Sequence, residues 1–358
     1  MPTRYGYLKS CALIAASLGM FSTGFAKMEQ WTDTKGNAFK AEPAEALGPL
    51  ALFRLPNKSG KLLPFRMLSP ADCVRFAQQV RALPVPAADW AQSNTAIGSE
   101  IYGYAMRVEG AKLVAADLKG RPEPRFYVLF YVDNGEPKSW EMLGKTGWPF
   151  QELQKKHPGL VEGLMFGLKH SNIEHANMAT QSKLSYLVAR RDDEYRMEKI
   201  GRLIPSYGYG VTVCNSGGVP LFPPVTGETD EGAQKIMADV GGLLELLNSG
   251  NPKAWADRVY YWKAVQPALH ATDKCEPMLV GDPLNPAKLG ELLVKRFEAT
   301  LFVSAEGAVT GVSMAPGADL PEELVQPITE ALQKAQLVPA VDGGKFVPGK
   351  YHYRFGAN

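Results

Sequence analysis

The sequence predicts a chain of mixed α/β and α+β class, with a central α/β domain between two smaller β-rich modules. Its 358 residues exceed what one hydrophobic core usually spans. An unbroken apolar run at 126–132 predicts a buried strand, and alternating helix and strand patterns follow it up to residue 250. Short-strand patterns occupy the regions on either side, 27–80 and 283–358.

Composition and charge argue against several functional classes. The formal net charge is only +2, and the 39 basic residues form no dense run. This balance disfavours a nucleic-acid-binding surface and a polybasic membrane patch. Hydrophobic and charged fractions of 45% and 21% are those of a globular protein and not of a disordered one.

The N-terminus has the three-part pattern of a secretory signal peptide. A short segment with Arg4 and Lys9 precedes the apolar stretch 11–21, and small residues follow up to Ala26. The apolar stretch is too short for a spanning helix, so we expect no membrane span in the mature chain. We therefore expect a periplasmic or secreted protein whose signal peptide, 1–26, is cleaved after Ala26.

Residues 27–80 predict a small β module that ends in a helix. Its expected elements are a strand opened by Trp31, a turn at 33–37, strands at 39–43, 50–54 and 62–65, and a helix that begins after Ser69. The order W-T-D-x-x-G-x-x-F-K-A-E, then N-K-x-G-K, then P-F-x-x-L-S-x-A-D, resembles the SHD-type homology module. That module is a small SH3-like β unit found at the front of many secreted bacterial proteins. Residues 81–96 are expected to form a linker.

The central domain, 97–250, alternates strand and helix patterns. In chain order we expect a hairpin at 108–114, strands at 126–132 and 160–168 with a helix around 148–157 between them, helical turns up to 200, strands at 211–214 and 219–222, and a helix at 233–247. Asn215-Ser216-Gly217-Gly218 is the turn signal that joins the last two strands. The order β-α-β-α-β-β-α indicates a mixed sheet with helices.

This order resembles the thioredoxin-like fold in its nucleoredoxin or tryparedoxin variety. The lysine-rich K-K-H-P-G at 155–159 and I-P-S at 204–206, before the β-hairpin, carry the resemblance together with the strand order. It implies that Pro205 corresponds to the family's cis-proline, although a trans turn proline is the alternative. Ile204, Pro205 and Tyr207 would then line a peptide groove, with ordinary packing of the tyrosine as the alternative.

The same resemblance identifies a degenerate active-site loop. In the family the first core strand leads into W-C-x-P-C. Alignment on Pro137 places Asn134 at the Trp, Gly135 and Lys138 at the two cysteines, and Glu136 before the proline. Thiol–disulfide exchange needs a thiolate of lowered pKa, which Gly and Lys cannot supply. We expect no catalytic residue in this loop and no cofactor.

The cysteines leave one redox alternative open. The mature chain would keep Cys73, Cys214 and Cys275, and no C-x-x-C occurs. An odd number leaves at least one thiol free in a monomer or pairs it between chains. A displaced thiol, Cys214 or Cys73, is therefore the candidate for an alternative oxidoreductase activity.

Histidines give no support to a metal site. His157, His170 and His175 are the candidates, but the last two are spaced H-x-x-x-x-H, which is not the i,i+4 pair of a helical zinc site. We expect ordinary surface histidines and no bound metal.

Residues 251–282 predict a helical connector, and 283–358 a C-terminal ββαβ module. Its expected elements are strands at 297–303 and 308–313 around the turn 304–307, a helix at 319–335, and a last strand at 350–355. The series F-V-S-A-E-G-x-V-T-x-V, then L-x-P-A-x-x-G-G-K, resembles the TonB C-terminal domain. That family recruits partners by strand addition, so the resemblance implies binding of a protein or an extended peptide.

These patterns together predict an exported, non-enzymatic binding or scaffold protein of three modules. A displaced-thiol oxidoreductase and a structural component of the cell envelope are the alternatives.

Overall fold

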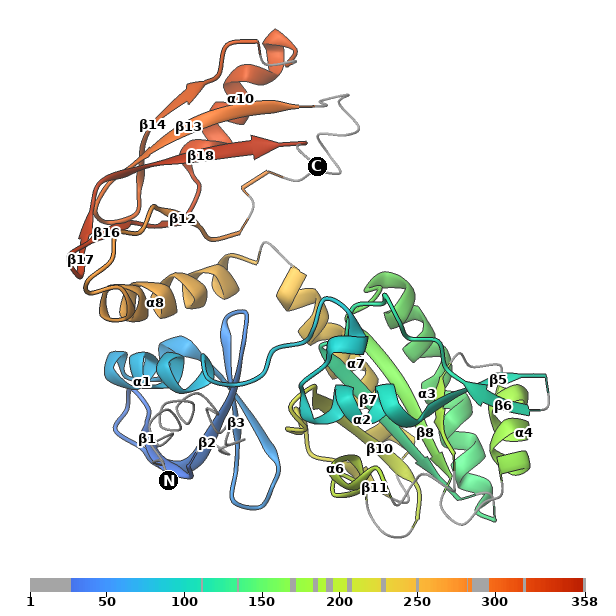
Figure 1. The fold of residues 1–358 in the computed structure, drawn as a ribbon. Coiled ribbons are helices and arrows are strands. Elements are labelled where there is room, and N and C mark those ends of the chain that lie inside the picture. Colours follow the sequence, from blue (N-terminus) through green and yellow to red (C-terminus); the bar gives the residue numbers. More distant parts are fainter. Residues whose placement is uncertain are drawn as a thin grey trace, which may run out of the picture.

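The computed structural model describes residues 27–110, 112–133, 135–167, 172–182, 186–190, 196–204, 208–226, 230–248, 251–281, 283–284, 296–317 and 320–356. The predicted class is confirmed: an α/β domain with a mixed sheet accompanies smaller β-rich units (Figure 1). No helix in these ranges has the length and apolar character needed to cross a membrane.

The N-terminal unit is a four-stranded antiparallel meander covered by a helix. Its elements are β1 (Glu29–Thr32), β2 (Ala38–Leu47), β3 (Leu50–Arg54), β4 (Gly60–Pro64), the 3-10 turn η1 (Phe65–Met67) and α1 (Pro70–Val80). Strand β2 continues through Pro43, where its register against β3 shifts. Proline has no N–H for the ladder, so a bulge at this position is the expected adjustment. Ser69 is the N-cap of helix α1, and its Oγ accepts a hydrogen bond from the Asp72 N–H at 3.1 Å.

Helix α8 (Pro252–Leu269) completes the core of this unit, although it follows the central domain in the sequence. Tyr261 stacks on Phe65 with ring centroids 3.9 Å apart. The Tyr260 hydroxyl donates to the carbonyl of Leu68 at 3.0 Å. Figure 1 shows α8 between α1 and the C-terminal sheet, and its contacts with α1 and β15 agree. The segment that the sequence predicts as a helical connector is therefore a packing element.

The central domain is built on a seven-stranded sheet in the order β11-β10-β7-β8-β9-β5-β6. Its strands are β5 (Ala105–Glu109), β6 (Lys112–Ala115), β7 (Phe126–Val132), β8 (Val161–Gly167), β9 (Leu187–Ala189), β10 (Gly210–Asn215) and β11 (Val225–Thr226). β7, β8 and β9 are parallel to one another, and β10 runs antiparallel beside β7. A helix after β7, the parallel β8 and the antiparallel β10 have the order that the thioredoxin-like resemblance implies.

Helices cover both faces of this sheet (Figure 1). They are η2 (Trp90–Gln92), α2 (Ala96–Tyr104), α3 (Pro137–Lys156), α4 (Asn172–Ser182), α6 (Glu198–Gly201) and α7 (Asp230–Asn248). Alternate residues of β7 enter two cores: Phe130 packs with residues of α3, α4 and α7, whereas Leu129 packs with residues of α2 and α6. Every residue of β7 is buried. This burial on both faces explains its unbroken apolar sequence.

Several details of the central domain differ from the sequence prediction. Helix α2 was not expected, and Trp90, in the segment predicted as a linker, is fully buried in the core beside α2. Strand β9 was not expected, because its three apolar residues are too few to give a periodic signal. The second hairpin strand is β11 at 225–226, not 219–222. Residues 219–222 follow the turn closely and form no separate strand: Pro220 makes a bridge with Cys214, the Leu221 N–H donates to the Val213 carbonyl, and the Val219 carbonyl accepts from the Asn215 N–H.

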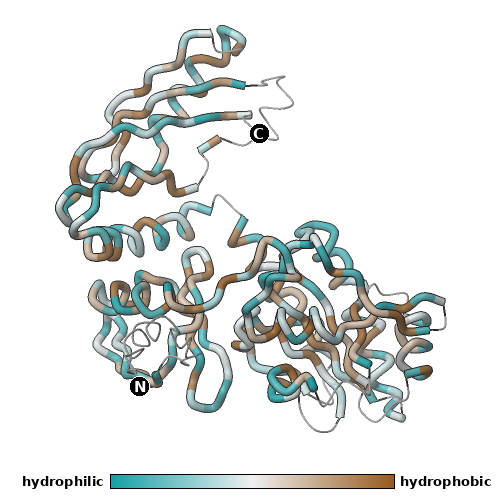
Figure 2. The backbone as a smooth tube through the Cα atoms, in the orientation of Figure 1, coloured by the Kyte–Doolittle hydropathy of each residue, from teal (hydrophilic) through white to brown (hydrophobic). Residues whose placement is uncertain are grey.

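The C-terminal unit has a three-stranded antiparallel sheet in the order β14-β13-β18. Its elements are β12 (Met278–Leu279), β13 (Phe297–Val303), β14 (Val309–Met314), α10 (Glu322–Gln333), β15 (Leu337–Val338), β16 (Ala340–Asp342), β17 (Lys345–Val347) and β18 (Gly349–Phe355). Along β13, buried and more exposed residues alternate, because α10 covers one face of the sheet. Figure 2 shows hydrophobic and hydrophilic positions mixed along these strands. Segment 278–279 also belongs here, because β12 pairs with β15.

Candidate functional site

The loop after β7 is a compact turn held by its own hydrogen bonds. The Asp133 carboxylate accepts from the Gly135 N–H at 3.0 Å, and the Asp133 carbonyl accepts from the Glu136 N–H at 3.0 Å. The Ser139 hydroxyl oxygen accepts a hydrogen bond from the Asp133 N–H at 3.0 Å. Ser139 is fully buried, so it anchors the loop to the helix beneath. The chain therefore passes directly from the central strand into α3.

Helix α3 begins with an acidic cap. Glu136 is its N-cap, Pro137 follows at the first helical position, and the Glu136 carboxylate accepts from the Lys138 N–H at 3.4 Å. Gly135 and Lys138 are both exposed. A helix N-terminus favours negative charge, and here a carboxylate supplies it. The loop therefore lies at a helix N-terminus, the position that lowers a thiol pKa in redox proteins, but it contains no thiol and its Gly135 and Lys138 N–H groups are bonded to carboxylates. Asn134 lies outside the described residues.

Of the three residues predicted to line a peptide groove, the structure describes only Ile204. Ile204 is half-buried and packs against the core formed by α2, α6 and their side of the sheet. Pro205 and Tyr207 lie outside the described residues, so the cis-proline and the groove stay predictions.

Cys214 lies at the opposite end of the sheet from the loop. It pairs with Tyr127, near the start of β7, whereas the loop follows the end of that strand at Val132. At about 3.3 Å per residue this separation is roughly 17–20 Å. Cys214 is fully buried, and burial raises the pKa of its thiol well above the ordinary value.

The other two cysteines belong to other units. Cys73, on α1, is fully buried, and burial together with nearby Asp72 raises its thiol pKa to about 12. Cys275 is half-buried and forms a β-bridge with Val341 in the C-terminal unit. All three cysteines are free thiols. None of them is placed to act in the loop at the start of α3.

His157 corrects the expectation that the candidate metal histidines are surface residues. It is only 5% exposed, its Nδ1 lies 3.0 Å from the amide nitrogen of Asn248, and its buried Nε2 has no hydrogen bond within the described residues. His170 and the side chain of His175 lie outside the described residues. Among the residues that are described, no group of His, Cys, Asp and Glu could hold a metal ion.

A partly buried polar network at the start of β7 was missed by sequence reasoning. The Arg125 guanidinium bonds the Glu45 carboxylate at 2.8 Å and the Ala46 carbonyl at 2.9 Å. The Asn215 amide donates to the same carboxylate at 3.0 Å. Glu45 comes from β2, so the network joins the N-terminal unit to the central domain. No local pattern signals it, since its members are separated by up to 170 positions.

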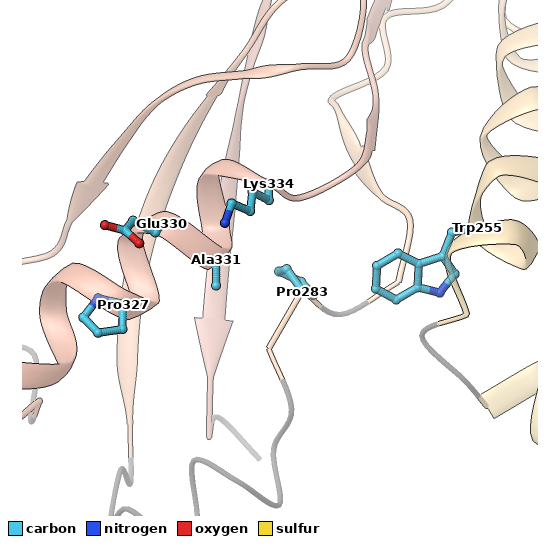
Figure 3. Close-up of a pocket in the computed structure, with 6 residues that line it drawn as sticks. All are labelled: Trp255, Pro283, Pro327, Glu330, Ala331 and Lys334. Carbon is cyan, nitrogen blue, oxygen red and sulfur yellow. The ribbon is translucent and has the colours of Figure 1, made fainter.

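A surface pocket of about 350 Å³ lies away from the loop, between α8 and α10 (Figure 3). It is lined by Trp255, Pro283, Pro327, Glu330, Ala331 and Lys334. Most of this lining is apolar, and its two charged residues come from the C-terminal unit. The pocket therefore has no connection with the candidate redox chemistry.

The sequence matches no protein-family model and no curated protein. Solved structures resemble part of the chain. Peroxiredoxin Q of Xanthomonas campestris has a TM-score of 0.30 at 12% identity, covering 40% of this chain and 93% of that chain. A thioredoxin-like protein from Parabacteroides distasonis has a TM-score of 0.23 at 15% identity, covering 32% of this chain and 81% of that chain. Thioredoxin from Wuchereria bancrofti has a TM-score of 0.26 at 12% identity, covering 34% of this chain and 83% of that chain.

Proposed function

We propose that this chain is an exported binding or scaffold protein whose thioredoxin-like domain has no redox activity. The observation that carries the proposal is the separation between the loop and the thiols. The loop at the start of α3 offers Gly135 and Lys138, while Cys214 lies at the far end of the sheet. Disulfide exchange requires an accessible thiolate that attacks a disulfide sulfur directly. A helix N-terminus without a sulfur atom performs no such step.

The displaced-thiol alternative has little physical support. Cys73 and Cys214 are fully buried, and burial raises the pKa of both thiols. A thiol of raised pKa is almost wholly protonated at neutral pH and is a poor nucleophile. Cys275 is more accessible, but it lies in the C-terminal unit.

Insulin reduction in the presence of dithiothreitol tests this proposal. The full-length protein is expected to give the same rate as buffer, and so are Cys73→Ser, Cys214→Ser and Cys275→Ser. Activity of the unsubstituted protein that disappears in one cysteine variant, with the other two unaffected, would establish the displaced-thiol alternative.

The binding activity is assigned to the C-terminal unit, whose sequence resembles the TonB C-terminal domain. Strands β14 and β18 are the outer strands of its sheet in the described part of the chain. An outer strand can accept an extended peptide as an additional strand, through backbone hydrogen bonds. This mode of binding suits a chain without a catalytic site.

Peptides with backbone N-methylation test strand addition without altering the protein. Methylation of every second amide removes the N–H donors on one edge of an extended peptide and leaves its side chains unchanged. One methylated set is expected to lose binding and the complementary set to keep it, because only one edge faces the protein. Equal affinity of the two sets would contradict strand addition.

Export is supported by the signal-like pattern of residues 1–26. Mass spectrometry of the protein from its native cell is expected to find an N-terminus at Lys27. An intact N-terminus at Met1 on a cytoplasmic pool would contradict it.

A further inference from the structure

The exposed face of the C-terminal sheet carries a row of basic side chains. Lys350, His352 and Arg354 occupy alternate positions of β18, and all three are exposed. Tyr353, between two of them, is buried against the opposite face of the sheet, on the side of α10. Successive side chains of a strand point to opposite faces, so the three basic residues share the face that α10 leaves uncovered.

The strand beside this row neutralises little of its charge. Across the ladder, Lys350 pairs with Phe302, His352 with Thr300 and Arg354 with Glu298. Glu298 is the one carboxylate on this part of β13, and it lies 3.6 Å from Arg354 and 3.9 Å from Arg296. Both arginine side chains are more than 60% exposed, at 66% and 69%. Two arginines thus share one carboxylate, and the described part of this face carries a surplus of positive charge.

An exposed aromatic ring lies next to the basic row. Phe302 is 39% exposed, and the Lys350 Nζ lies 5.4 Å from its ring centroid. On its other side Phe302 pairs with Gly311, where a Cβ would come within 3.5 Å of the ring. Because glycine has no side chain, that flank of the ring stays open to contact.

We propose that this face selects an extended acidic segment of a partner protein, with carboxylates at every second residue and apolar residues between them. The row repeats every two residues, about 6.6–6.8 Å along the strand. An extended peptide has the same repeat, so each carboxylate can meet one basic side chain. Oppositely charged side chains on neighbouring strands attract, and like charges repel. Phe302 gives an apolar contact at the Lys350 end of the row.

This inference rests on the proposed binding of an extended peptide by the C-terminal unit, and it names the chemistry of that peptide. Three ten-residue peptides serve as probes of the full-length protein: alternating Glu/Val, alternating Ser/Val and alternating Lys/Val. Fluorescence anisotropy at low salt is expected to give at least tenfold tighter binding of the Glu/Val peptide than of the Ser/Val peptide. The difference is expected to shrink as salt is added, because exposed charges are screened.

Charge reversal in the protein identifies the residues. The double substitution Lys350→Glu with Arg354→Glu is expected to remove the acidic preference and to favour the Lys/Val peptide. Lys345→Glu, on the separate β16-β17 hairpin, makes the same kind of charge change and is expected to keep the acidic preference. Matching thermal unfolding of the variants shows that the fold is intact.

The outcomes separate this inference from the proposal beneath it. Equal affinity for the three peptides, or an acidic preference that survives the double substitution, would overturn the charge selection and leave strand addition standing. Binding by none of the three would remove strand addition itself. Tight binding of the Glu/Val peptide with no effect of N-methylation would keep the charge selection and exclude backbone pairing.

Discussion

The two ends of β7 are built in different ways. At its start, the Glu45 carboxylate accepts from both Arg125 and Asn215, and the N-terminal unit packs against the central domain. At its end, the loop from Asp133 to Ser139 is held by hydrogen bonds among its own residues. The start of the strand contacts the N-terminal unit, whereas the loop after its end is held by bonds within a short segment.

This difference separates what maintains the fold from what would carry chemistry. The hydrogen bonds of the loop use backbone groups and the side chains of Asp133 and Ser139, so they do not depend on the side chains at 135 and 138. The polar network and the apolar contacts at the other end keep the strand in place. The central domain can therefore remain folded whichever side chains stand at 135 and 138.

The largest expected effect comes from breaking the apolar contact between the N-terminal unit and the central domain. Leu52, on β3, is fully buried in the main core of the central domain. Leu52→Ala is expected to lower the free energy of unfolding by about 2–5 kcal/mol, from lost apolar burial and the cavity left behind. Urea denaturation followed by circular dichroism measures it. Val85→Ala is the control: Val85 is 71% exposed, and its loss is expected to change the value by less than about 0.5 kcal/mol.

A smaller effect is expected from the polar network. Arg125→Ala leaves the Glu45 carboxylate without its cation and the Ala46 carbonyl without this side-chain donor, and the expected loss is about 1–3 kcal/mol. The value is below that of a fully buried pair, because the Arg125 side chain is 33% exposed. Lys155→Ala is the matched control, since its pair with Glu152 is exposed and is worth less than about 1 kcal/mol. Equal losses in the two variants would show that the network is not a docking contact.

A pH dependence is expected from His157 at the end of α3. Burial and the neighbouring Lys156 lower the pKa of its imidazole, so the folded state favours the neutral form. In the unfolded chain the imidazole protonates at its ordinary pKa, near 6.5. Its stabilising contribution is therefore full above that pH and is lost as the pH falls from about 6.5 towards the lowered pKa.

Comparison with His157→Gln isolates this contribution. The free energy of unfolding, measured at pH 7.5 and 5.5, is expected to fall more in the unsubstituted protein than in the variant. A larger fall in the variant would mean that His157 is better accommodated as a cation, contrary to its buried position.

Local patterns predicted the elements well where one strand or helix determines its own sequence. Residues 126–132 and 297–303 were predicted with the bounds that the structure gives, because their burial patterns are regular. Strand β2 continues past Pro43 by a register shift, which a propensity argument cannot anticipate. The packing of α8 on α1 joins segments far apart in the sequence, and no local signal reports such a contact.

In the candidate site, too, local sequence patterns predicted some features and tertiary packing determined the others. The sequence placed the loop directly after the core strand, and the structure has it there, between β7 and α3. The burial of His157 and the distance between Cys214 and the loop depend on tertiary packing and strand register, and only the structure gives them.

Restoring the two cysteines tests the central claim most directly. The double variant Gly135→Cys with Lys138→Cys places two thiols at the start of α3, where the helix N-terminus lowers a thiol pKa. The variant is expected to form a disulfide that dithiothreitol reduces reversibly, and to reduce insulin faster than the unsubstituted protein, which is expected to match buffer. A variant that folds but forms no disulfide, or an unsubstituted protein that is already active, would contradict the account of a retained fold with lost redox chemistry.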